Sequence, residues 1–148
     1  RFTFPWRFYI AGPKSRARIS ELAVESALHK ASEPVDEAAI RAKMTKKTVN
    51  PAALVVFGLP RVDDEFQSRE DYASVACGIQ NFCLVMAAEG FQTKWSTGGL
   101  TTRDSTYEAL AIDAQEIEIV GFVWVGKAAA APAAQKRPAL ADVLTTLD

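Results

Sequence analysis

Two short stretches of the chain combine residue types that could hold an anion or a cofactor. Residues 94–99, KWSTGG, place two hydroxyl side chains and two glycines at the end of an expected strand, where backbone amides can approach a ligand closely. Residues 135–138, QKRP, place two cations on an extended segment, and arginine binds phosphate through two parallel hydrogen bonds. A strand-to-turn junction and a solvated basic pair are the simpler interpretations. Taken alone, neither stretch identifies a function.

Side chains that could act as a catalytic acid, base or nucleophile are scarce. The one histidine, His29, falls late in a helical pattern, where a solvated imidazole complements the helix dipole. No nucleophile elbow, zinc-binding histidine pair or phosphate loop occurs. The pair Lys46 and Lys47 fits the end of a helix better than an anion site, and the acidic run at 63–65 fits a solvated loop. We therefore nominate no catalytic residue and no metal site, and an enzyme of this kind would rely on a cofactor for its chemistry.

The composition is that of an ordinary globular protein. The 148 residues are 49% hydrophobic and 24% charged, with a formal net charge of −1. We expect one domain over residues 1–148. The charge balance argues against nucleic-acid binding, which usually shows a basic excess, and no apolar run is long enough to span a bilayer. Cys77 and Cys83 match no zinc or redox spacing, which fits a reducing, cytoplasmic location.

Hydrophobic periodicity predicts a mixture of helices and strands. Strands are expected at 7–12, 52–59, 91–99 and 116–126. Helices are expected at 13–32, 35–49, 69–90 and 103–112, with a low-complexity extended connection at 127–138 and a weak helix or docking segment at 139–147. This mixture favours an α+β layer architecture over a helical bundle or a β-sandwich.

The helix expected at 69–90 has the strongest signal. Ser68 and Asp71 form a plausible capping pair, and Gly90 is a natural C-terminal stop. The segment is apolar on most faces, which predicts a central, buried helix. Gly78 in its middle would cost about 1 kcal/mol against alanine, so we expect close packing there.

Taken in order, these stretches resemble the nitroreductase family of flavoproteins over nearly the whole chain. FPWRFYIAG (4–12) resembles the family's proline–tryptophan corner at the start of a strand, and VNPAALVVFG (49–58) resembles its first central strand. YASVACGIQNFCLVMAAEGFQTKWSTG (72–98) resembles the long central helix with the strand that follows, and is the most specific match. EIVGFVWVG (118–126), followed by KRP, resembles the closing strand and C-terminal extension. The W-x-[ST]-G turn is similar to that of the small, minimal-fold branch.

The resemblance implies an α+β nitroreductase-like fold, with a mixed central sheet flanked by helices and a long buried central helix. It also implies a tight homodimer with two FMN molecules at its interface. In such a protein NAD(P)H delivers hydride to the flavin and leaves. A small-molecule electron acceptor, often a nitroaromatic or a quinone, then enters the same pocket. We therefore expect an FMN-dependent NAD(P)H oxidoreductase, with the choice between NADH and NADPH open.

The resemblance also implies which residues contact FMN. Trp95, Ser96 and Thr97 match the turn that lies along the flavin, with Gly98 next to it. Two cations match the family's basic residues near the FMN phosphate: Arg137 and, with a weaker match, Lys136. Two residues fall in the segment that lines the flavin from the partner subunit, namely Arg1 and Phe4, and Phe4 stands where a polar side chain is common.

Two alternatives stay open. One is another flavin reaction on the same fold, such as reductive dehalogenation or enone reduction. The other is a non-catalytic flavin-binding or scaffold dimer. The family begins with a helical arm whose arginine-serine-arginine motif grips the FMN phosphate, and nothing in this sequence corresponds to it. Either the sequence lacks that segment, or the protein holds flavin differently or not at all.

Overall fold

Helices and strands succeed one another along the chain in the computed structural model, which describes residues 3–31, 36–130 and 133–147. The strands are β1 (Arg7–Ile10), β2 (Ala53–Pro60), β3 (Gln92–Ser96) and β4 (Ile117–Gly126). The α-helices are α1 (Pro13–His29), α2 (Glu37–Thr48), α3 (Glu65–Ala88) and α4 (Asp104–Leu110), and a single 3-10 turn covers Leu140–Asp142. The predicted elements are confirmed, except that the expected C-terminal helix is reduced to this turn.

The four strands form one sheet in the order β1-β2-β4-β3, and all three of its pairings are antiparallel. The α+β class is confirmed, but the prediction of a mixed sheet is wrong for the described residues. Strand β2 pairs antiparallel to β1, although α1 and α2 separate the two strands in the sequence. Strands β2 and β3 run parallel to each other, but β4 lies between them.

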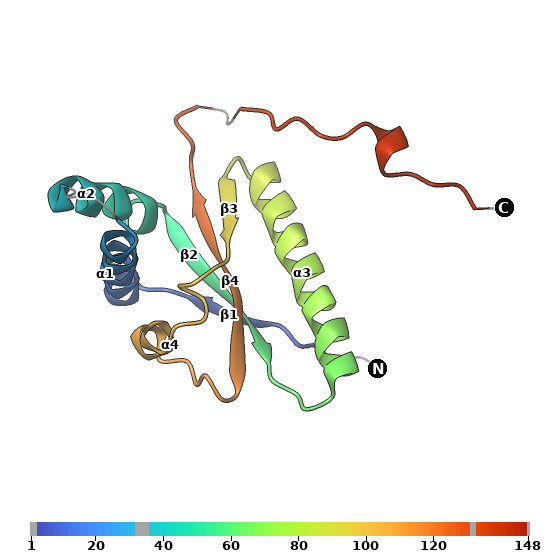
Figure 1. The fold of residues 1–148 in the computed structure, drawn as a ribbon, viewed down its shortest axis with the longest axis horizontal. Helices are drawn as coiled ribbons and strands as arrows, with labels where there is room; N and C mark the ends of the chain where they lie inside the picture. The colour runs from blue at the N-terminus through green and yellow to red at the C-terminus, as the bar shows by residue number, and fades with distance from the viewer. Residues whose placement is uncertain (1–2, 32–35, 131–132, 148) are drawn as a thin grey trace.

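Helices cover both faces of the sheet, with α3 on one side and α1, α2 and α4 on the other (Figure 1). Strand β2 shows the consequence, because its side chains alternate between two buried clusters. Leu54 and Val56 pack toward α1 and α4, whereas Val55 and Phe57 pack toward α3. The continuous apolar run in this part of the sequence is therefore explained by burial on both faces.

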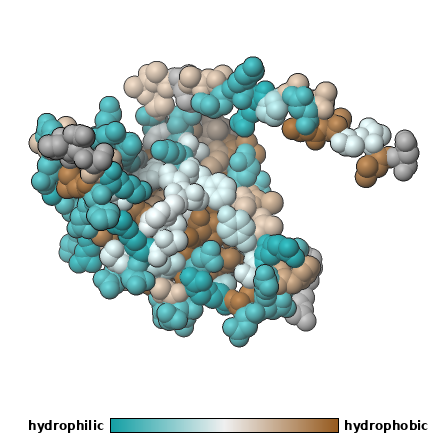
Figure 2. Space-filling view, in the orientation of Figure 1, coloured by the Kyte–Doolittle hydropathy of each residue, from teal (hydrophilic) through white to brown (hydrophobic). Residues whose placement is uncertain are grey.

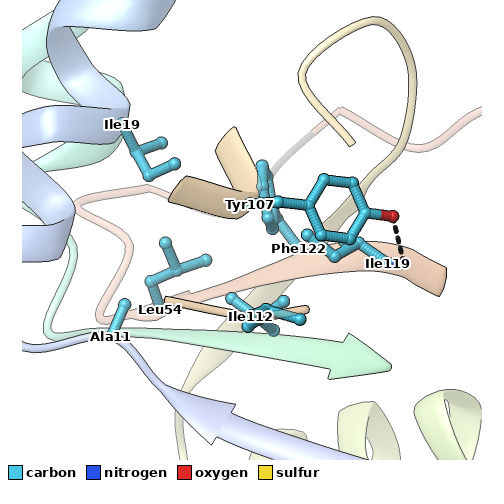
Figure 3. Packing of buried hydrophobic residues seen from close by; sticks show 8 residues of the cluster. Ala11, Ile19, Leu54, Tyr107, Ile112, Ile119 and Phe122 are labelled. Carbon is cyan, nitrogen blue, oxygen red and sulfur yellow. Dashed lines mark hydrogen bonds between the residues drawn. The ribbon is translucent and has the colours of Figure 1, made fainter. Parts of the chain in front are cut away.

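Helix α4 is fixed to the sheet by the ring and the hydroxyl of Tyr107. The ring lies in the buried cluster with Phe122 and Leu54, and the hydroxyl accepts a hydrogen bond from the backbone N–H of Ile119 at 3.0 Å (Figure 3). A buried tyrosine oxygen without a partner would be costly, so this bond sets the depth at which the ring can sit. The loop between β3 and α4 is thereby anchored at its far end.

Helix α3 begins four residues earlier than the sequence pattern predicts. Asp64 is its N-cap and accepts hydrogen bonds from the backbone N–H groups of Phe66 and Gln67. The predicted capping pair of Ser68 and Asp71 is therefore wrong. Asp71 is instead buried, and it accepts hydrogen bonds from the side chains of Thr3 and Gln67.

The other expectations for α3 are met in part. Gly90 follows the helix with a φ of +79°, as a C-terminal stop requires. A Cβ at Gly78 would lie 3.4 Å from the Trp6 ring, so the helix and the N-terminal corner pack closely there. Only one side of the helix is buried in the single chain, however, because Leu84 and Val85 are 58% and 56% exposed. The expectation of a fully buried helix is wrong for this chain by itself.

Helices α1 and α2 pack against each other and are bridged by one arginine. The Arg41 guanidinium donates to Glu21 at 2.6 Å and to Glu37 at 3.1 Å. These carboxylates, above all the hydrogen-bonded Glu21, raise the pKa of Arg41 above its ordinary value.

No helix in the described ranges has the length and apolar character needed to cross a membrane.

After β4 the chain leaves the sheet as an extended arm that projects away from the body (Figure 1). Leu140, Val143, Leu144 and Leu147 on this arm are each at least 60% exposed. Hydrophobic atoms are correspondingly visible along its outer end (Figure 2). In the described structure, no other part of the same chain covers these apolar side chains.

Candidate functional site

A large hollow in the described structure lies where α2, β3 and the end of β4 meet. Its volume is about 950 Å³, which is within the usual range for a site that holds a cofactor or a drug-sized ligand. One wall is the end of α2 with the loop at 48–52, and the opposite wall is β3 with the turn that follows. Residues 126–129, which begin the C-terminal arm, close a third side.

Lysines are the charged residues of this hollow. Four of them line it, namely Lys46, Lys47, Lys94 and Lys127, and the described lining contains no aspartate or glutamate. None of the ion pairs found in the described part of the chain involves these four residues. We call this site the lysine hollow. Its uncompensated positive charge attracts anions.

Aromatic and hydroxyl side chains supply the rest of the surface. Strand β4 contributes Phe122 and Trp124, whose rings contact each other at a centroid distance of 6.2 Å. Phe91 lies under the Lys127 ammonium, which is 5.8 Å from the ring centre. Serine and threonine residues also line the hollow: Thr48, Thr93, Ser96, Thr97 and Thr101. The hollow therefore combines an apolar floor, suited to a flat ring, with donors that bind a phosphate or a polar ring edge.

The rim formed by the loop at 48–52 is braced by Arg16 of α1. Its guanidinium donates to the backbone carbonyls of Thr48 and Ala52 at 3.4 and 3.3 Å. It also donates to the carbonyls of Val49 and Pro51. One side chain thus satisfies four carbonyls at and just after the end of α2, where backbone acceptors have no partner within the helix. Arg16 thereby fixes the wall that carries Lys46 and Lys47.

The turn after β3 brings two of the expected ligand residues into the hollow. Ser96 faces it from the last position of β3, and Thr97 follows on the turn. Gly98 has a φ of +113°, a conformation that favours glycine, and its carbonyl accepts from the backbone N–H and the hydroxyl of Thr101. Gly98 shapes the turn without lining the hollow.

Trp95 lies on the opposite face of the sheet from the lysine hollow. It pairs in register with Val123, which belongs to the cluster under α3, whereas Ser96 pairs with Phe122 on the hollow side. Its indole lies directly over Gly121 of β4. Trp95 does not line the hollow in the single chain, so its expected place along the flavin stays a prediction.

The remaining expected site residues are not gathered at the hollow in the single chain. Lys136 and Arg137 are exposed on the C-terminal arm, beyond the last lining residue, Ala129. Phe4 lines a separate cleft of about 230 Å³ beside α3. Arg1 lies outside the described residues.

Sequence reasoning missed several residues of the site. Lys46 and Lys47 were visible as a pair but were assigned to a helix end, and they do occupy that position while also lining the hollow. Lys94, Lys127 and Arg16 gave no signal, because each has a role only through residues far away in the sequence. No group of histidine, cysteine, aspartate or glutamate suited to a metal ion occurs among the described residues.

Comparisons with known proteins agree with the fold. A family model described as the nitroreductase family matches residues 3–127. In Escherichia coli K12, the protein named "Putative NAD(P)H nitroreductase YdjA" is 25% identical over 122 residues, which cover 82% of this chain and 64% of that protein. The chain therefore spans somewhat less than two thirds of this relative's length.

Solved structures share the fold. A nitroreductase-like family protein from Bacillus cereus superposes with a TM-score of 0.79 at 22% identity, covering 99% of this chain and 75% of that one. An iodotyrosine deiodinase bound to FMN and 3-iodo-L-tyrosine superposes with a TM-score of 0.68 at 14% identity, covering 93% and 75% of the two chains. At these identities the likeness concerns the fold.

Proposed function

The chain belongs to the nitroreductase family, and on that premise we propose that it acts as an FMN-dependent oxidoreductase. It takes hydride from NAD(P)H and passes electrons to a small organic acceptor of the nitroaromatic or quinone type. The observation that carries this proposal is the lysine hollow, which joins four cations to an aromatic floor beside the Ser96–Thr97 turn. FMN has the matching parts, a flat ring system and a phosphate.

The donor set of the hollow fits FMN. The volume of about 950 Å³ accommodates a molecule of this size. Lysine ammonium groups bind phosphate as point charges, and the lack of carboxylates in the described lining leaves the anion without a repelling neighbour. Phe122 and Trp124 offer apolar surface to a flat ring, and the hydroxyls of Ser96 and Thr97 offer donors to its polar edge.

Bound FMN supplies the hydride chemistry, and the chain's own residues bind and orient. Lys46, Lys47, Lys94 and Lys127 favour negative charge held in the hollow. Ser96 and Thr97 supply hydrogen bonds from a turn fixed by Gly98. No residue is assigned the role of a catalytic acid or base, since His29, the one histidine, does not line the hollow.

We assign Lys136 and Arg137 to the phosphate end of FMN. The arm leaves the rim of the hollow at Ala129, and Arg137 follows eight residues later. An extended segment of this length reaches up to about 26 Å, at roughly 3.3 Å per residue. The arm can therefore bring its two cations back over the hollow, or over the hollow of a second copy.

We propose that the protein is a homodimer with α3 in the interface. Large apolar or aromatic side chains of this helix are exposed in the single chain, namely Phe66, Tyr72, Leu84 and Val85, each at least 42% exposed. Apolar surface of this extent on a helix usually contacts another chain. A second copy offers the same surface, so the contact closes by two-fold symmetry. The arrangement would also bring Phe4, which lies beside α3, toward the partner's site.

Two other uses of the fold remain as alternatives. A flavin reaction on another substrate, such as dehalogenation or enone reduction, needs the same lysine hollow and differs only in the acceptor. A flavin-binding or scaffold dimer without turnover needs no acceptor at all. The main proposal and the first alternative differ only in the molecule that accepts electrons from the flavin. Trials with different flat organic acceptors therefore separate them.

Anaerobic stopped-flow spectroscopy tests the proposed function. The protein reconstituted with FMN is mixed with NADH or NADPH, and the flavin absorbance near 450 nm is followed. Bleaching, followed by recovery when menadione or nitrofurazone is added, supports an oxidoreductase. Bleaching with recovery only on an iodinated phenol or an enone supports the other flavin reactions. FMN that binds but does not bleach supports the scaffold.

A further inference from the structure

Strand β4 contains a glycine where the structure leaves no room for any other residue. Gly121 is buried in the middle of the strand and pairs with Phe57 of β2. A Cβ at this position would lie 2.7 Å from Cδ1 of Trp95, closer still to Nε1, and 3.2 Å from the carbonyl oxygen of Ser96. A glycine inside a strand weakens it, and often marks the close approach of another group. Here that group is the Trp95 indole.

The position of this contact matters because Trp95 and Ser96 are neighbours that point to opposite faces of β3. Trp95 lies on the α3 side over Gly121, and Ser96 lies on the side of the lysine hollow. The position of the indole therefore determines how the end of β3 is tilted, and with it the direction in which Ser96 and Thr97 point. Trp95 is 40% exposed and belongs to neither buried cluster, and its indole lies directly against Gly121.

A second feature of β4 supports this arrangement. The register between β2 and β4 shifts at Phe57 and Gly58, which oppose Gly121 and Ile119, so Val120 is the extra residue of a bulge. A bulge increases the local twist and re-aims the residues next to it. Gly121 directly follows this bulge, and the indole occupies the space that the twist and the missing side chain leave.

We propose that Gly121 is a positioning residue for the ligand-binding turn. The space that Gly121 leaves holds the Trp95 indole in place, and the indole in turn directs Ser96 and Thr97 toward the lysine hollow. The proposal rests on the proposed function, because FMN is the ligand whose binding reports the position of the turn. A methyl group at position 121 displaces the indole and the Ser96 carbonyl together. The half-exposed indole can move into solvent, so the fold survives while the turn loses its direction.

Two single variants and their combination test whether Gly121 positions the Trp95 indole. Each is prepared as the full chain and titrated with FMN, with flavin fluorescence as the readout. We expect Gly121→Ala and Trp95→Ala each to weaken FMN binding by about tenfold, equivalent to one charge-assisted or two ordinary hydrogen bonds. The combined variant should bind FMN no more weakly than Trp95→Ala, because without the indole the added methyl group has nothing to displace. Gly12→Ala is the control, since a Cβ there meets no atom within 4 Å and Gly12 does not line the hollow.

Indole N–H signals in ¹⁵N NMR spectra provide a readout that does not depend on FMN. In flavin-free protein, Gly121→Ala should shift the Trp95 indole signal and leave those of Trp6 and Trp124 in place. Wild-type affinity in Gly121→Ala, an unmoved Trp95 signal, or additive losses in the combined variant would each overturn the proposal. If Gly121→Ala does not fold, recovery of folding in the combined variant supports the proposed contact between Gly121 and the Trp95 indole, and continued misfolding overturns the proposal. Failure of wild-type protein to bind FMN would instead count against the proposed function.

Discussion

Arg16 does not line the lysine hollow, but we expect it to stabilise the hollow more than any other single residue outside the lining. Its guanidinium donates to the carbonyls of Thr48, Val49, Pro51 and Ala52. Hydrogen bonds from a charged donor contribute about 1.5–3 kcal/mol each when both partners are buried. The loop at 49–52 is largely exposed, so most of its carbonyls turn to water when the arginine is removed. We therefore expect Arg16→Ala to lower the free energy of unfolding by about 1.5–3 kcal/mol in total.

Urea unfolding followed by circular dichroism measures this effect. For a chain of this size the loss corresponds to a melting point lower by about 3–12 °C. Arg18→Ala is the matched control, because Arg18 lies two residues away on α1, is exposed, and has no hydrogen bond or ion pair in the described structure. Arg16→Lys should recover less than half of the loss, since an ammonium cannot reach four carbonyls at once. A difference of less than about 0.5 kcal/mol between Arg16→Ala and Arg18→Ala would refute the bracing role.

Four further predictions follow from particular contacts. Gly58→Ala should cost about 1–3 kcal/mol in urea unfolding, because a Cβ there would lie 2.8 Å from Cγ2 of Ile117; an unchanged midpoint would contradict the tight packing. Asp71→Ala should cost about 1–3 kcal/mol and Asp71→Asn much less, since only the amide retains an oxygen for Thr3; equal losses would argue against that bond. Leu84→Asp should convert a dimer into monomers in light scattering, and a folded wild-type monomer at micromolar concentration would remove the dimer proposal. Arg137→Ala should weaken FMN binding about tenfold with no change in the stability of flavin-free protein; equal dissociation constants would place Arg137 outside the site.

The fold was largely accessible from local patterns in the sequence. The apolar run at 52–59 and the proline-started helix at 13–32 correspond closely to β2 and α1, because burial on two faces and an N-terminal proline leave direct marks on the residues. The start of α3 was placed too late. Residues 65–68 contain only one apolar side chain, that of Phe66, so they carry no hydrophobic periodicity, and the capping role of Asp64 is evident only from its two backbone hydrogen bonds.

The site was less accessible, since it depends on contacts between distant segments. Ser96 and Thr97 were found because they are adjacent to a glycine turn. Lys94 and Lys127 are separated by a helix and a strand, and they share one hollow only after β3 pairs with β4. The direction of the Trp95 ring depends on the empty space at Gly121, which no local pattern in the sequence reveals.

Titration of FMN into the purified protein tests the central claim most directly. Quenching of flavin fluorescence gives the dissociation constant for wild-type protein, for a variant combining Lys46→Gln with Lys94→Gln, and for Lys14→Gln, which lies on α1 outside the hollow. We predict saturable binding to wild-type protein that weakens with added salt, a loss of about tenfold or more in the double variant, and no change in Lys14→Gln. Absence of saturable binding, or equal affinities in all three proteins, would contradict the assignment of the lysine hollow as a flavin site.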